Sequence, residues 1–197
     1  THDGQIVIYD GPDLVFKGRE ILFGSNSDGG ENNQIIIIDV TEKSRPVKIS
    51  NLNYSFSGYA HQGILTEDQK FFFLGDELDE LQYGSPTHTR VFDLSSLSNP
   101  KSHLSYFGGV NAIDHNGYVV GNKFYLASYT AGLRVLDISQ VENKNLIEIG
   151  FFDTYPPNNN PKFNGVWNVY PFFNSGIIAI NDIDSGLFLV KPSDKDE

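Results

Sequence analysis

The sequence predicts an all-β protein, and three observations support that fold class. Aromatic and β-branched residues gather in runs of about four to eight residues, which Gly, Asn, Asp, Ser and Pro separate. No segment is predicted to be a helix, and the best candidate, residues 66–69, is interpreted as a turn between strands. Similar strand patterns also return along the chain, which indicates a repeated structural unit.

One repeated feature is an apolar strand that ends in a polar residue and then turns. Residues 35–40, 89–94, 133–138 and 187–192 follow this pattern. The first three copies end in Asp39, Asp93 and Asp137, and a carboxylate suits a turn because it can accept backbone N–H bonds. We therefore expect each aspartate to hold the turn after its strand.

A second repeated feature precedes each of these strands. It reads Thr1-His2-Asp3-Gly4, Ala60-His61-Gln62-Gly63, Asp114-His115-Asn116-Gly117 and Trp167-Asn168-Val169. From His2 to His61, His115 and Asn168 the intervals are 59, 54 and 53 residues. A period near 55 residues with about four strands per unit is typical of a β-propeller. We expect a single propeller domain, with blades at about 1–58, 59–111, 112–164 and 165–197.

The third copy shows the expected unit most clearly. Its strands are predicted at 116–120, 123–129, 133–138 and 147–153. The first copy has extra residues near 11–18 and 26–33, and the second has an acidic insertion from 75 to 88. The fourth copy lacks an outer strand. Since propellers have about four to eight blades and this chain starts abruptly without methionine, we expect part of a larger ring.

Composition excludes several classes of function. The net charge is −11, which argues against a nucleic-acid partner because phosphate contacts need a basic surface. Cysteine is absent, so disulfides and cysteine-based zinc sites are excluded. No apolar stretch approaches the roughly 18 residues of a membrane-spanning helix. No nucleophile motif or phosphate-binding loop is present, so the sequence names no catalytic residue and no organic cofactor.

The repeated strand, as in Leu133-Arg-Val-Leu-Asp137, resembles the LVIVD repeat of bacterial surface proteins. The chain also resembles the choice-of-anchor B family at residues 2–5, 18–20, 23–26, 60–63, 65–69, 75–80, 114–116, 129–137, 150–155 and 170–173. The resemblance implies a secreted or cell-surface propeller, of which this chain would be the C-terminal half. The chain departs from the family at Gly4, Ile64 and Gly117. The resemblance implies no particular biochemical activity for this chain.

The three histidines share one phase of the repeat. We expect His2, His61 and His115 each to lie just before the first strand of a blade, which lines the central channel of a propeller. Three imidazoles at one level could hold a divalent metal such as zinc, manganese or calcium. Asp3, Gln62, Asn116 and Asn168 could support them. The alternative is that each histidine is a structural channel residue that bonds a neighbouring blade.

Other polar groups allow weaker predictions. Asp76, Glu77, Asp79 and Glu80 could form a calcium loop, although a solvated loop explains them as well. Residues 26–32 resemble them and are interpreted as a hairpin loop. His88 and His103 are interpreted as surface residues. Tyr129 is interpreted as a strand-packing residue that could instead face the channel, and Trp167 as a blade-core residue that could instead stack on a sugar.

Two functions fit these observations. The first is an extracellular or cell-surface binding module for a glycan, protein or matrix component, with a possible structural metal. The second is a metal-dependent extracellular lyase or hydrolase that acts on polysaccharide or other matrix material, by analogy with other propellers. Another copy of the chain, or a missing propeller half, is a further expected partner.

Overall fold

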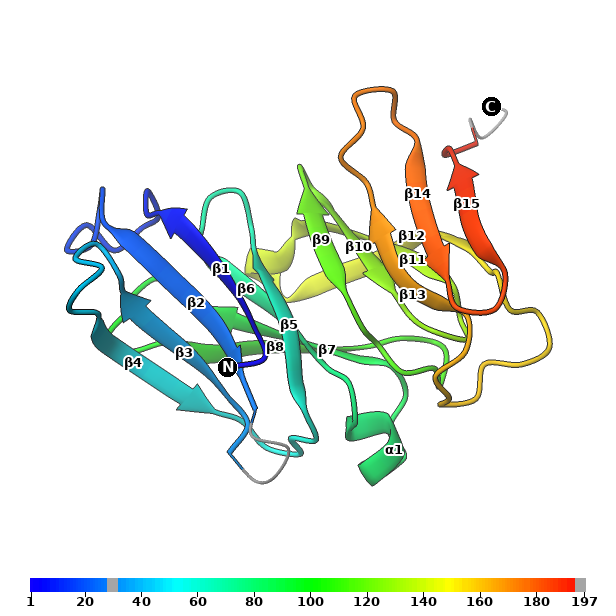
Figure 1. Ribbon diagram of the computed structural model, residues 1–197, viewed down its shortest axis with the longest axis horizontal. Coiled ribbons are helices and arrows are strands. Elements are labelled where there is room, and N and C mark those ends of the chain that lie inside the picture. The colour runs from blue at the N-terminus through cyan, green and yellow to red at the C-terminus, as the bar shows by residue number, and fades with distance from the viewer. Residues whose placement is uncertain (28–31, 194–197) are drawn as a thin grey trace.

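The computed structural model describes residues 1–27 and 32–193 and confirms the all-β fold class. Residues 28–31, in the expected 26–32 loop, lie outside the described residues. Four antiparallel sheets follow one another along the chain (Figure 1). Their strands are β1 (Asp3–Ile8), β2 (Glu20–Asn26), β3 (Gln34–Asp39) and β4 (Val47–Asn53); β5 (Ala60–Leu65), β6 (Phe71–Asp76), β7 (His88–Asp93) and β8 (Lys101–Phe107); β9 (Gly117–Val120), β10 (Lys123–Ala127), β11 (Leu133–Gln140) and β12 (Asn145–Phe152); and β13 (Val166–Tyr170), β14 (Ile178–Asp182) and β15 (Gly186–Val190).

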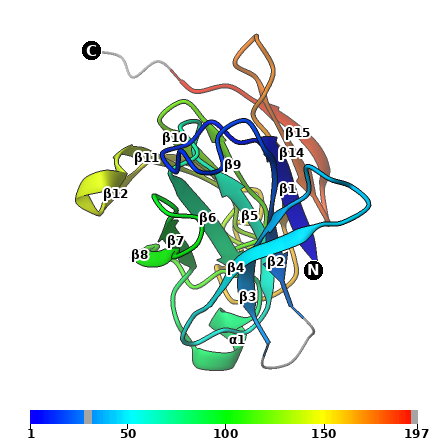
Figure 2. The ribbon, with the colours of Figure 1, turned by 90° about the vertical axis from the view of Figure 1, so that its left-hand side faces the viewer.

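The sheets are arranged as propeller blades. The first strands lie side by side, because β1 contacts β5, β5 contacts β9 and β9 contacts β13 (Figures 1 and 2). Three hydrophobic cores fill the spaces between the four sheets, one between each successive pair. No such core joins the first and last sheets in the described residues, so the arc is open. The strands of the third sheet lie within two residues of their expected bounds.

Strand β6 explains why the run Phe71–Leu74 is apolar without interruption. Side chains alternate between the two faces of a strand. Phe72 and Leu74 therefore enter the core with the first sheet, while Phe71 and Phe73 enter the core with the third. A strand buried on both faces shows no polar alternation.

The acidic insertion contains a helix that the sequence did not predict. Helix α1 (Asp79–Tyr83) is one short turn, and Gly84 ends it with φ at 69° and its N–H bonded to the Glu80 carbonyl. A second short helix, of 3-10 type, covers Val141–Asn143. Both are too short to show a helical period in the sequence. No helix in the described part of the chain has the length and apolar character needed to cross a membrane.

The predicted aspartate turns are confirmed. Asp39 accepts the backbone N–H of Thr41 at 3.0 Å. Asp93 and Asp137 accept the equivalent N–H groups, two residues further on, at 2.8 Å each. The same local bond therefore follows β3 and β7, which end at their aspartates, and lies in the last residues of β11, which continues to Gln140.

Candidate metal centre

The three phased histidines meet in one column of rings. The centroids of His2 and His61 are 4.3 Å apart, and those of His61 and His115 are 4.2 Å apart. Trp167 continues the column at 4.6 Å from His115. His61 and Trp167 both stand at irregularities of strand pairing, between Ala60 and Gln62 and between Val166 and Asn168, and such bulges re-aim side chains. Trp167 thus takes the histidine position in the fourth blade.

Backbone carbonyl groups fix the orientation of two of these rings. His2 Nδ1 lies 3.0 Å from the His61 carbonyl oxygen, and His115 Nδ1 bonds the Trp167 carbonyl oxygen. A carbonyl oxygen only accepts, so each Nδ1 carries the hydrogen and donates it. In a neutral ring the other nitrogen, Nε2, then presents a lone pair.

Glu77 faces the Nε2 atoms of His61 and His115. Its carboxylate oxygens lie 3.4 Å from His115 Nε2 and 3.8 Å from His61 Nε2. Tyr129 donates its hydroxyl hydrogen to Glu77 at 2.6 Å. The ligand atoms of His61, Glu77 and His115 all lie within 4.8 Å of one another, so one metal ion could contact all three.

The electrostatic environment keeps the imidazoles of His61 and His115 neutral. Burial, together with the neighbouring His115 and His2 rings, lowers the pKa of His61 to about 3. Burial also lowers the pKa of His115. Metals bind the neutral imidazole, so both rings are in the form that a metal requires. Burial raises the pKa of Tyr129, which therefore stays protonated and donates.

The expected supporting residues divide into two groups. Asp3 and Asn116 line a pocket of about 340 Å³ beside the histidines, together with Tyr59 and Trp167. Gln62 instead accepts the N–H of Gly117 at 2.9 Å, and Asn168 accepts the N–H of its neighbour Val169. Trp167 packs on His115 but is 49% exposed, so its interpretation as a residue of the blade core is wrong.

The acidic run is not the solvated loop that one interpretation expected, because Asp76, Asp79 and Glu80 are buried. Nor do the four carboxylates meet at one point. Asp76 accepts the Tyr54 hydroxyl at 2.7 Å and the N–H groups of Gly58 and Tyr59. Glu77 turns to the histidines, while Asp79 and Glu80 lie near Asp114.

His88 and His103 are also less exposed than expected. His88 is buried, with Nδ1 3.0 Å from Asp79 and its ring stacked on Phe107. His103 is half-buried, and its Nε2 lies 2.8 Å from the Val141 carbonyl oxygen. Sequence position gave no sign of this burial, because the partners come from other segments.

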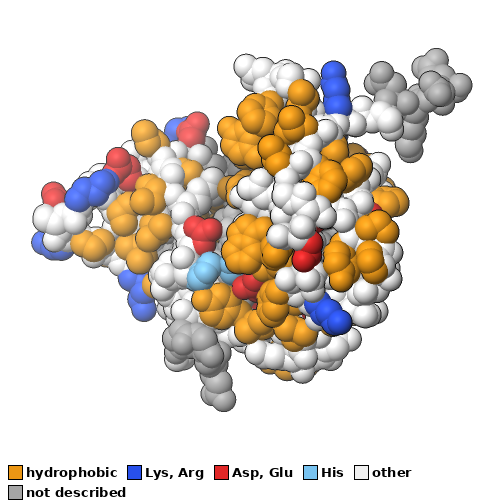
Figure 3. Space-filling view, turned by 45° about the vertical axis from the view of Figure 1, so that its right-hand side comes forward, with side chains coloured by type: hydrophobic (Ala, Val, Ile, Leu, Met, Phe, Trp, Pro, Cys, Tyr) orange, Lys and Arg blue, Asp and Glu red, His pale blue; other side chains and the backbone are white. Residues whose placement is uncertain are grey.

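Sequence reasoning missed Glu77 as a neighbour of the histidines, and it missed the bond from Tyr129. The pairing of β5 with β6 places Asp76 opposite Ala60, and the N–H of Glu77 then bonds the Tyr59 carbonyl. No residue pattern predicts that the Glu77 carboxylate reaches His61 and His115. In the space-filling view, histidine and acidic side chains reach the surface side by side (Figure 3).

Comparison with known proteins supports the fold alone. Neither a protein-family model nor a curated protein matches the chain. A solved protein of Lactobacillus plantarum is 12% identical with a TM-score of 0.65, over 89% of this chain and 54% of its own. The periplasmic gluconolactonase of Pseudomonas aeruginosa is 14% identical with a TM-score of 0.66, over 87% of this chain and 50% of its own. The chain therefore spans about half the length of these structures.

Proposed function

We propose that this protein is an extracellular β-propeller binding module with a divalent metal ion held by His61, Glu77 and His115. One observation carries the proposal: the buried Nε2 atom of His115 has no hydrogen-bond partner and faces a carboxylate oxygen at 3.4 Å. With Nδ1 committed to the Trp167 carbonyl, a neutral His115 places a lone pair against an acceptor. A cation between them turns this repulsion into two bonds.

The donor set favours zinc or manganese over calcium. Two imidazole nitrogens and one carboxylate suit these metals, whereas calcium prefers oxygen ligands. The Trp167 carbonyl orients His115 and the Tyr129 hydroxyl holds Glu77, which is how the partners of metal ligands act. His2 stacks on His61 and is the nearest further ligand. Three protein ligands leave a position open for a bound molecule.

The exposed ring of Trp167 supports a glycan as that molecule. It lines the same pocket as Glu77, and about half of its surface is exposed, so it could contact a sugar ring. We place the chain with LVIVD-repeat proteins of the choice-of-anchor B family, on the resemblance of its repeats. That assignment, and the periplasmic location of one structural neighbour, support a secreted or cell-surface location. A second copy or a further propeller half remains a proposed partner.

A hydrolase is the second candidate. The neighbour from Pseudomonas aeruginosa is a gluconolactonase on a similar fold, which supports sugar lactones and polysaccharides as substrates to test. An open metal position would serve such chemistry by polarising a carbonyl or activating water. The identity is low, so this candidate depends on the proposed metal rather than on the neighbour.

Elemental analysis of the purified protein tests the metal. We expect about one zinc or manganese ion per chain, and loss of that ion in the double variant His61→Ala/His115→Ala and in Glu77→Gln. His103→Ala is the matched control, because this histidine bonds a carbonyl far from the column, and it should keep the ion. A metal-free protein that takes up neither ion on incubation would contradict the proposal.

Glycan-array binding and lactonase assays then separate the two candidates. Metal-dependent glycan binding that Trp167→Ala abolishes, without turnover of lactones or polysaccharides, supports the binding module. Turnover that disappears with the metal supports the hydrolase.

A further inference from the structure

A second cluster of acidic side chains lies buried between the second and third sheets. Asp79 and Glu80 come from α1, and Asp114 comes from the segment before β9. All three are at most 1% exposed. One carboxylate oxygen from each lies within 4.8 Å of the others. This cluster is separate from the histidine column and uses none of its ligands.

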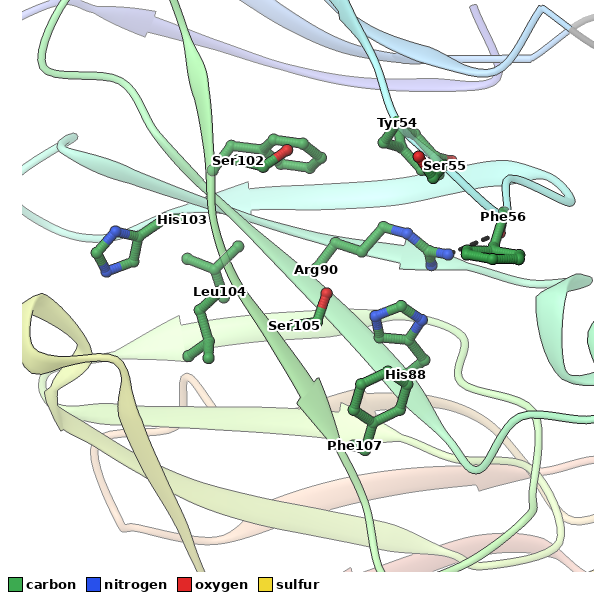
Figure 4. Close-up of a pocket in the computed structure, with 12 residues that line it drawn as sticks. Tyr54, Ser55, Phe56, His88, Arg90, Ser102, His103, Leu104, Ser105 and Phe107 are labelled. Carbon is green, nitrogen blue, oxygen red and sulfur yellow. Dashed lines mark hydrogen bonds between the residues drawn. The ribbon is translucent and has the colours of Figure 1, made fainter.

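The positive groups around the cluster are too few to balance it. Arg90 binds Asp79 at 2.7 Å and also donates to the Phe56 carbonyl (Figure 4). His88 adds at most one further charge, from 3.0 Å. Asp76, the next buried acid, adds a negative charge nearby and is already satisfied by Tyr54 and backbone N–H groups. Four buried acids thus face one arginine and one histidine.

Three carboxylate oxygens in this cluster have no hydrogen-bond partner. They are Asp79 Oδ1, Glu80 Oε2 and Asp114 Oδ1, and all three are shielded from solvent. The other oxygen of each carboxylate has a donor. Arg90 donates to Asp79, the N–H of His88 donates to Glu80, and the Thr89 hydroxyl donates to Asp114 at 3.5 Å. Buried carboxylate oxygens without partners are strongly unfavourable, so something must neutralise these three.

We propose that Asp79, Glu80 and Asp114 bind a calcium ion that ties α1 to the third sheet. An all-oxygen donor set is the one that calcium prefers, and it takes six to eight such ligands at about 2.3–2.6 Å. Magnesium gives up its water reluctantly and fits a dry site less well. Zinc prefers sites that include nitrogen or sulfur.

Proton sharing is the rival explanation. Burial, with the nearby Asp114 and Asp79, raises the pKa of Glu80 to about 11, and burial raises the pKa of Asp114. A proton between Glu80 and Asp79 would satisfy two oxygens, and the third, on Asp114, would need a second proton of its own. A calcium ion satisfies all three together, which is why we favour it.

Thermal unfolding of the whole chain tests the proposal. Unfolding releases a buried ion, so the midpoint Tm responds to calcium even if exchange in the folded state is slow. In 1 mM calcium we expect a Tm roughly 5–10 °C above the value in EGTA, for an ion at about a hundredfold excess over its Kd. Magnesium at the same concentration should give less than half that shift.

Variants assign the response to these residues. Asp114→Asn and Glu80→Gln keep the shape of the side chains, and each should lose most of the calcium shift. Glu77→Gln is the matched control: it removes an acid two positions from Asp79 that faces the histidines instead, and should keep the shift while losing the transition metal. Failure of the channel site would therefore leave this result unchanged.

Two outcomes would overturn the proposal. If wild type shows no calcium shift, the carboxyl groups share protons instead. If wild type and both variants shift equally, calcium binds elsewhere. If Asp114→Asn does not fold, the calcium shift of Glu80→Gln alone tests the proposal. If neither variant folds, elemental analysis of the wild type counts the calcium bound after dialysis against EGTA and then against calcium. We expect about one ion per chain.

Discussion

At the scale of single residues, a hydrogen bond on one side of an imidazole decides what the other side can bind. The Trp167 carbonyl takes the hydrogen of His115 Nδ1, so a neutral ring offers a lone pair at Nε2. Glu77 stands opposite, held by the Tyr129 hydroxyl. Removal of Tyr129 should therefore weaken metal binding without touching a ligand.

The variant Tyr129→Phe tests this directly. It keeps the ring, which is buried against His115, and removes only the hydroxyl that bonds Glu77. We expect the zinc Kd from calorimetry to weaken by about 10–100-fold, as is usual when a partner of a metal ligand is lost. Tyr125→Phe, in the adjacent strand β10, is the control and should change zinc affinity by less than a factor of two. Equal affinities in both variants would mean that Glu77 needs no support.

The sequence predicted the histidine column because a repeat places equivalent residues at equivalent positions. It could not predict Glu77 or the exposed Trp167. Glu77 lies near His61 because β5 pairs with β6. Trp167 lies at an irregularity in the pairing of β13 with β14, and no residue pattern predicts that irregularity. The sequence also could not predict that Asp114 lies beside Asp79 and Glu80, because contacts between blades depend on the packing of whole sheets.

At the scale of elements, the glycine two residues after each histidine lets the first strand approach the second. A Cβ at Gly63 would lie 2.1 Å from Cζ of Phe72, and a Cβ at Gly117 would lie 2.2 Å from Cζ of Phe124. Both aromatic rings belong to second strands, β6 and β10. Glycine at position 117 thus has a physical reason: the Phe124 ring occupies the space that a side chain would take.

The variant Gly63→Ala should therefore destabilise the protein. Since the new Cβ meets a buried ring, the ring or strand must shift, at a cost of about 1–3 kcal/mol in the free energy of unfolding. Gly150→Ala is the matched control, because a Cβ at this strand position meets nothing within 4 Å. Urea unfolding measures both. A neutral Gly63→Ala would mean that β5 moves freely against Phe72.

The aspartate turns give a second prediction at this scale. The side chain of Thr41 and then Arg19 lower the pKa of Asp39, and hydrogen bonds from Ser139 lower that of Asp137. A carboxyl with a lowered folded pKa stabilises the fold above its unfolded pKa, near 3.9, and loses this effect as the pH falls through the folded value.

We therefore expect the variant Asp39→Asn/Asp137→Asn to differ most from wild type at neutral pH. The amide oxygen can still accept the turn N–H, so the loss of stability at pH 7 should be small. The two stability curves should converge as the pH falls from 5 to 3. Urea unfolding across that range measures them, with Asp10→Asn as an exposed control. A gap that widens at low pH would contradict the assignment.

At the scale of the whole molecule, stability should fall towards the ends of the arc. Strand β6 is covered on both faces, whereas in the described part of the chain each end sheet packs on a single neighbouring sheet. The uncovered faces expose Ile6 and Ile8 in β1 and Leu187 and Leu189 in β15, each at 61% or more. Hydrophobic side chains gather on the last sheet in Figure 3 as well. Exposed apolar faces of this kind mark surfaces that another partner can cover.

Hydrogen exchange should reveal this gradient. Amides of β15 lie in the three-stranded last sheet, and no strand pairs with its outer edge among the described residues, so local opening there exposes little buried surface. We expect them to exchange at least tenfold faster than amides of β6 in dilute protein. If β15 is as slow as β6 at the lowest concentration, its face is already covered. If protection of β15 alone rises with protein concentration, a second copy covers it, and light scattering on the same samples should show the larger mass.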